Sequence, residues 1–134
     1  MERRLRLLLA DDSDEMLAVI DELLRPEFEI VGQVKDGCAM LRAAREHSPD
    51  LIISDLDMPK MNGIQATIRL AESGPSVPVI ILSIHNAREL IHQALTAGAG
   101  GYVIKSDAGD ELIEAVREVA RGRKFLSRSC AYSI

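Results

Sequence analysis

Residues 50–63 read Asp-Leu-Ile-Ile-Ser-Asp-Leu-Asp-Met-Pro-Lys-Met-Asn-Gly. This stretch places a short apolar run, residues 51–53, just before the acidic Asp55. Pro59, Asn62 and Gly63 then break the strand, because proline lacks a donor for the ladder and Asn-Gly favours a turn. We therefore expect Asp55 at the carboxyl end of a buried strand, which in open parallel sheets is the edge where ligands bind.

The same succession of apolar runs and helical segments continues on both sides of this stretch. Apolar runs predict strands at residues 5–10, 28–34, 51–55, 77–83 and 101–104. Apolar residues at helical spacing predict helices between Ser13 and Pro26, at 40–47, 64–73 and 87–97, and from 107 or 108 to 122. Strands that alternate with helices imply one α/β domain, with a parallel sheet covered by helices on both faces. Residues after 122 fit no periodic pattern.

Length, charge and cysteine usage limit the classes of protein to which the chain can belong. Its 134 residues suit one domain, and 47% of them are hydrophobic. A formal net charge of -5 disfavours nucleic-acid binding by this domain alone, because phosphate contacts need a positive field. Cys38 and Cys130 lie far apart without a metal-site spacing, which indicates free thiols in a reducing compartment. No apolar run has the length of a membrane span, so we expect a cytoplasmic protein without a membrane partner.

Polar residues follow four of the predicted strands, and in a parallel sheet these strand ends share one edge. They are Asp11 and Asp12, Asp55 and Asp57, Ser83, and Lys105. Clustered carboxylates stay ionised only if a cation offsets them, and carboxylates with waters suit Mg²⁺. An ammonium and a hydroxyl beside them can grip the oxygens of a phosphoryl group. A carboxylate can itself be the nucleophile, which would give an aspartyl phosphate.

These motifs, in this order, are signatures of a known family. Residues 7–12, 55–63, 82–83 and 100–105 carry them, and over residues 5 to about 122 the chain resembles the receiver domain of two-component response regulators. Residues 97–102 and 120–127 further resemble the NarL/FixJ-like class. The resemblance implies a flavodoxin-like (βα)5 fold with strand order 2-1-3-4-5. It also implies a regulatory domain that is not an enzyme, beyond self-catalysed phosphorylation and dephosphorylation.

The resemblance assigns roles to the residues at the strand ends. Asp55 would accept phosphate from a histidine-kinase phosphohistidine, and Lys105 would pair with the phosphoryl group. Mg²⁺ would be held by the side chains of Asp12 and Asp55, by the backbone carbonyl of Asp57, and by Asp11 through a water. Ser83 would hydrogen-bond the phosphoryl group and move inward, followed by Tyr102 as the buried-or-exposed switch residue. His85 and Asp57 flank the pocket, and we expect them to tune the rate at which water removes the phosphate.

The resemblance also predicts domains and partners. Residues 1–124 would form the receiver, and residues 125–134 a tail or linker stub to a missing helix-turn-helix output domain. The expected partners are a sensor histidine kinase, a second copy on phosphorylation, and DNA only through the missing output domain, which would control transcription. Two residues depart from the family pattern: Ser83 replaces a common Thr, and Ser106 replaces a Pro that often follows a cis bond. A cis bond before Ser is costly, so we expect a different loop after Lys105.

Other hypotheses remain open from the sequence. Tyr102 would also suit a half-buried core position with no switching role, although the switch is the favoured interpretation. Asp55 and Asp57 mimic the nucleophile motif of haloacid-dehalogenase-type phosphatases, although that family places the nucleophile strand first and the acidic pair last. A stand-alone receiver that binds partners without phosphate is a third hypothesis.

Overall fold

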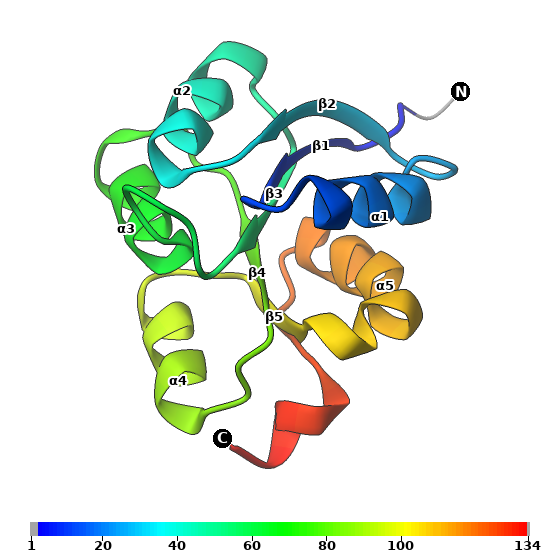
Figure 1. The fold of residues 1–134 in the computed structure, drawn as a ribbon, viewed down its shortest axis with the longest axis vertical. Helices are drawn as coiled ribbons and strands as arrows, with labels where there is room; N and C mark the ends of the chain where they lie inside the picture. The colour runs from blue at the N-terminus through cyan, green and yellow to red at the C-terminus, as the bar shows by residue number, and fades with distance from the viewer. Residues whose placement is uncertain (1–2, 134) are drawn as a thin grey trace.

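A parallel sheet runs through the centre of the protein, and helices cover both of its faces (Figure 1). The computed structural model describes residues 3–133; residues 1, 2 and 134, which the predicted domain and tail include, lie outside the described residues. The strands follow the order β2-β1-β3-β4-β5-β6, and every pairing is parallel. Their bounds are Arg6–Ala10 (β1), Glu29–Val34 (β2), Leu51–Asp55 (β3), Val79–Ser83 (β4), Gly101–Ile104 (β5) and Phe125–Leu126 (β6). The predicted fold class and the order of its first five strands are confirmed.

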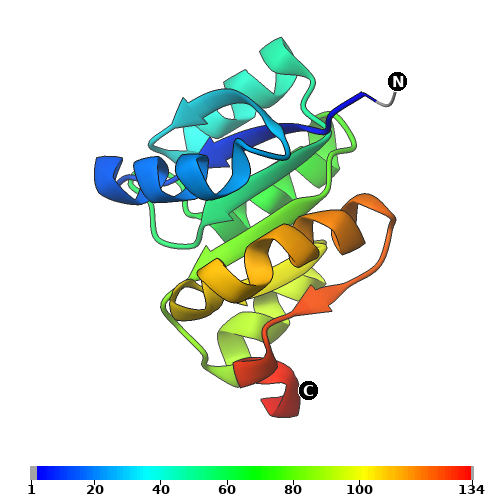
Figure 2. The same ribbon diagram turned by 90° about the vertical axis from the view of Figure 1, so that its right-hand side faces the viewer.

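Five α-helices connect the strands in two layers. Their bounds are Asp14–Leu24 (α1), Gly37–His47 (α2), Gly63–Ser73 (α3), Arg88–Thr96 (α4) and Ala108–Ala120 (α5). Helices α1 and α5 cover one face of the sheet, and α2, α3 and α4 cover the other (Figures 1 and 2). Each face of the sheet has its own hydrophobic core, and alternate residues of β1 point into one or the other. Leu7 and Leu9 pack with α1 and α5, whereas Leu8 packs with α2 and α3. This double burial explains why the strands read as continuous apolar runs.

Side-chain caps fix where three of these helices begin. The Ser13 hydroxyl accepts a hydrogen bond from the backbone N–H of Met16 at 3.1 Å, as the sequence predicted for the start of α1. Asp36 caps α2 in the same way, and Asn62 forms a reciprocal capping box with Gln65 at the start of α3. Because each cap follows a strand end, these loops hold the polar residues at the carboxyl edge of the sheet.

Two short elements differ from the sequence-based expectations. The single turn η1, Lys105–Asp107, precedes α5 and was not predicted, and no peptide bond among residues 3–133 is cis. The tail after α5, which fits no periodic pattern, forms β6 beside β5 and then the 3-10 segment η2, Arg128–Ser133. A strand of two residues is too short to leave a periodic signal. Within residues 3–133, no helix has the length and apolarity needed to cross a membrane.

Candidate functional site

Three aspartates converge at the carboxyl edge of the sheet. Asp11 and Asp12 follow β1, and Asp55 is the last residue of β3. One carboxylate oxygen from each lies within 4.8 Å of the others. Asp11 and Asp55 are buried, with 1% and 5% of their surface exposed, whereas Asp12 is exposed. The structure therefore brings together the acids that the sequence predicted to converge.

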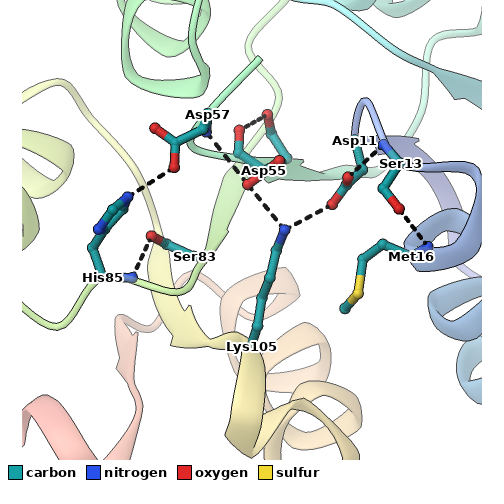
Figure 3. A network of polar contacts seen from close by, with 9 residues as sticks. Asp11, Ser13, Met16, Asp55, Asp57, Ser83, His85 and Lys105 are labelled. Atoms are coloured by element: carbon teal, nitrogen blue, oxygen red, sulfur yellow. Dashed lines mark hydrogen bonds and ion pairs between the residues drawn. The ribbon is translucent and has the colours of Figure 1, made fainter.

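Lys105 lies between two of these acids (Figure 3). Its Nζ is 3.2 Å from Asp11 Oδ2 and 3.2 Å from Asp55 Oδ1. Burial alone would lower the pKa of Lys105, but Asp55 and Asp11 outweigh it and the pKa is raised. Lys105 is therefore a protonated ammonium that lies beside the carboxylate of Asp55 at the end of β3.

The environment of Asp55 opposes its ionisation. Burial raises the pKa of this carboxyl, and the neighbouring Asp11 raises it further. Lys105 and the backbone N–H of Asp57, which donates to Asp55 Oδ1 at 3.3 Å, offset part of this effect. A carboxylate that lacks full compensation gains from any further positive charge beside it.

The chemistry of the donor set fits a hard divalent cation. Asp11 Oδ1 accepts a hydrogen bond from the Ser13 N–H at 2.9 Å, but Asp11 Oδ2 is buried without any hydrogen bond. Its contact with Lys105 is close enough for an ion pair but lacks hydrogen-bond geometry. Buried carboxylate oxygens without donors are costly unless a cation or water is near. The exposed Asp12 lines a hollow with Asp57, which leaves the cluster open to ions from solvent.

A second group of residues surrounds the loop after β4. Ser83, the last residue of β4, is fully buried, and its hydroxyl accepts a hydrogen bond from the His85 N–H at 2.9 Å. The His85 ring Nε2 lies 2.8 Å from Asp57 Oδ2 (Figure 3). Tyr102 is fully buried, and its hydroxyl donates to the His85 carbonyl at 2.7 Å. His85 thus connects Ser83, Asp57 and Tyr102 through three separate groups.

Close backbone approach sets the geometry beneath Asp55. The N–H of Gly63 donates to the carbonyl of Leu56 at 2.8 Å, which pulls the start of α3 against the end of β3. A Cβ at Gly63 would lie 2.3 Å from the carbonyl oxygen of Asp55. The Asn62-Gly63 pair of the opening stretch is therefore needed for space at Gly63 and for a helix cap at Asn62.

Sequence reasoning missed how His85 is used. Asp57 and His85 were each expected beside the pocket, because each lies two residues past a strand-end site residue. Their direct contact, and the use of the His85 carbonyl by Tyr102, come from the path of the loop and have no sequence signal. Of the two interpretations of Tyr102, the structure shows a buried side chain, and its hydroxyl bond to this loop places it beside the site.

Comparison with known proteins identifies the family. The family described as "Response regulator receiver domain" matches residues 7–117. The chain belongs to this family. This receiver is similar to the transcriptional regulatory protein DegU of Brevibacillus brevis, with 33% identity over 135 residues that cover 99% of this chain and 57% of DegU. It is also similar to the nitrate/nitrite response regulator protein NarL of Escherichia coli (strain K12), with 32% identity over 125 residues that cover 92% of this chain and 58% of NarL.

Solved structures agree with this assignment. A crystal structure of a two-component response regulator of the LuxR family from Aurantimonas sp. SI85-9A1 superposes on the receiver with a TM-score of 0.93 at 30% identity, covering 98% of this chain and 96% of that chain. These relatives place the receiver in the NarL/FixJ-like class. The chain spans less than two thirds of the length of the DegU and NarL relatives. The relatives are regulatory proteins, and DegU is named as a transcriptional regulatory protein.

Proposed function

We propose that the receiver is a phosphorylation-controlled switch, with Asp55 as the phosphoryl acceptor. The observation that carries the proposal is the position of Asp55 at the end of β3, where Lys105 lies 3.2 Å away and two further aspartates converge. A phosphorylated histidine of a sensor kinase would be the donor. A carboxylate oxygen of Asp55 attacks phosphorus, the phosphorus–nitrogen bond breaks, and the electron pair leaves with the imidazole.

The residues around Asp55 have separate tasks in this step. Lys105 pairs with a phosphoryl oxygen as negative charge moves toward the acceptor, and its raised pKa keeps it protonated. The Ser83 hydroxyl can donate to another phosphoryl oxygen while it continues to accept the His85 N–H. Ser83 is the last residue of β4 and Lys105 directly follows β5, so the sheet positions the backbone of both residues.

Mg²⁺ is the cofactor that we propose. The side chains of Asp12 and Asp55 and the backbone carbonyl of Asp57 would hold the ion, and Asp11 would act through a water. When bound, the ion neutralises phosphoryl oxygens that the three acids would otherwise repel. Asp11 Oδ2, which is buried without a hydrogen bond, and the raised pKa of Asp55, which follows from burial and from Asp11, support this proposal.

The phosphate would act on an output beyond this chain. We propose that Ser83 and Tyr102 form the switch, because the loop at His85 bonds to both. Output through a DNA-binding domain that follows the receiver, and assembly into dimers, are supported by one relative. A solved structure described as two RcsB dimers bound to two parallel DNAs matches this chain with a TM-score of 0.88 at 25% identity.

The test is the mass of the intact protein after incubation with acetyl phosphate and Mg²⁺. We expect the mass of one phosphoryl group on the wild type, and none on Asp55→Asn or in the presence of EDTA. Asp57→Asn is the matched control, because it keeps the backbone carbonyl and should still gain the phosphate. A phosphoryl group on Asp55→Asn would disprove the assignment. Turnover of a generic phosphomonoester would favour the phosphatase hypothesis, and partner binding unaffected by Asp55→Ala would favour the phosphate-independent module.

A further inference from the structure

The segment after α5 is bonded along the whole edge of β5. We call residues 125–130 the clasp. The Phe125 N–H donates to the Gly100 carbonyl at 3.1 Å, and the Ser127 N–H donates to the Tyr102 carbonyl at 3.0 Å. The Ser127 hydroxyl in turn accepts the Ile104 N–H at 2.8 Å. The clasp therefore uses both the donor and the acceptor groups of the strand that carries Tyr102.

A second set of bonds ties the clasp to α5 and η1. The Arg128 N–H donates to Glu111 Oε2 at 3.1 Å, and Glu111 is 7% exposed. The Ser129 hydroxyl donates to Asp107 Oδ2 at 2.7 Å, two residues beyond Lys105. In Figures 1 and 2 the end of the segment, drawn in red, follows the sheet edge beyond β5 toward α4. The clasp is therefore hydrogen-bonded to three elements, β5, α5 and η1, and is part of the fold.

The clasp also contributes to the core. Cys130 is fully buried and belongs to the same packed cluster as Tyr102 and Ile104. Its Sγ and its N–H both point to the Ser127 carbonyl, at 3.3 and 3.0 Å. Movement of Tyr102 would therefore disturb the packing of the clasp as well as one of its backbone bonds.

Tyr102 is held from two sides. Its hydroxyl bonds to the His85 carbonyl in the loop that Ser83 fixes, and its own carbonyl bonds to Ser127 in the clasp. We propose that the clasp is the element that carries the state of the acceptor site to whatever follows residue 130. The inference rests on the proposed function, since it takes phosphorylation of Asp55 as the input.

The contacts give the proposal a direction. A phosphoryl group that engages the Ser83 hydroxyl fixes the His85 loop in its present position, and this loop accepts the bond from Tyr102. Tyr102 then spends more time buried, and the edge of β5 stays in place for the clasp. Phosphorylation should therefore make opening of the clasp rarer, because it favours the conformation in which these bonds are made.

Cys130 supplies a native probe of clasp opening. Burial raises the pKa of its thiol, and the neighbouring Glu111 raises it further, so the reactive thiolate forms mainly when the clasp opens. Cys38, which is partly buried on α2, is changed to Ser so that one thiol remains. The rate of alkylation by iodoacetamide is measured with and without acetyl phosphate and Mg²⁺, and intact mass gives the extent of phosphorylation. We expect phosphorylation to slow the alkylation of Cys130 by roughly 5-fold or more, and Asp55→Asn to remove the effect.

A second arm tests the coupling without phosphate. His85→Ala keeps the backbone bonds of residue 85 but removes the ring contact with Asp57, which is the side-chain contact that anchors this loop. The loosened loop should hold Tyr102 less well and speed the alkylation of Cys130. His92→Ala is the matched control, because His92 is exposed on α4, and it should leave the rate unchanged. Circular dichroism of both variants checks that each is folded before the rates are compared.

The outcomes separate the coupling from the proposed function. A phosphoryl mass with an unchanged alkylation rate would overturn the coupling and leave the proposed function intact. If the protein gains no phosphoryl mass, the proposed function is overturned. The alkylation rate of Cys130 in His85→Ala would then be the remaining test of the coupling between the His85 loop and the clasp. An unchanged or slower rate in folded His85→Ala would overturn the coupling.

Discussion

The four aspartates around the site differ in their burial and in the charged groups beside them. Asp11 and Asp55 are buried, whereas Asp12 and Asp57 are exposed. Only the buried pair faces Lys105, and only Asp57 has a histidine partner. The sequence predicted all four at one sheet edge because each directly follows a strand or lies two residues past it. Their burial could not be predicted, since it depends on loops that cross above the sheet.

The pH dependence of stability follows from Asp55. Burial and Asp11 raise its folded pKa above the unfolded value, which is about 4. The stability that this group contributes is therefore full below the unfolded pKa, and it is lost as the pH rises through the folded pKa. We expect Asp55→Asn, in EDTA, to raise the free energy of unfolding at pH 7 relative to the wild type, and to raise it less at pH 4. Urea titration at both pH values measures this, and a larger gain at pH 4 would contradict it.

The contact between Asp57 and His85 should control how fast phosphate is lost. The two side chains meet 2.8 Å apart on one side of Asp55, opposite Lys105 (Figure 3). We expect Asp57→Ala and His85→Ala each to speed the loss of phosphate, because either change opens this side of the acceptor to water. The double variant should be no faster than the singles, since both remove the same contact. Decay of the phosphorylated mass after removal of the donor gives the rates, and unchanged rates would discard the idea.

At the scale of elements, the start of α3 is the tightest junction in the site. Gly63→Ala would place a methyl group 2.3 Å from the Asp55 carbonyl oxygen, so backbone must shift. We expect a loss of about 1–3 kcal/mol in the free energy of unfolding. Gly109→Ala is the matched control, because its Cβ would meet nothing within 4 Å and Ala is the better helix former. Urea unfolding of both variants decides the matter, and a Gly63→Ala variant as stable as the wild type would contradict the reasoning.

The elements also show what periodicity can and cannot predict. The strands and helices with several apolar residues were placed within a few residues, because each buries a full face in one of two cores. Strand β6 and the turn η1 were not predicted. Their bonds are made to residues far along the chain, as between Ser127 and Ile104, and such long-range pairing has no local signature.

For the whole molecule, the sheet topology is what makes the site predictable. All strands are parallel, so their carboxyl ends share one edge, and residues nearly a hundred positions apart, such as Asp11 and Lys105, meet there. The carboxylates, the hydroxyl and the lysine at that edge could be predicted from residue types and strand positions alone. The connection from His85 through Tyr102 to the clasp was not, because it runs through backbone carbonyls that every residue type possesses.

Convergence of charge at this edge predicts a response of the whole fold to Mg²⁺. An ion that binds only the folded chain stabilises it by about 2.7 kcal/mol at a hundred times its Kd, which corresponds to roughly 5–10 °C in Tm. Asp12→Asn should remove most of this rise, because it takes one carboxylate from the cluster of three. Asp57→Asn should keep the rise, because its backbone carbonyl remains. Thermal unfolding with Mg²⁺ or EDTA measures the shift, and an equal rise in Asp12→Asn would place the ion elsewhere.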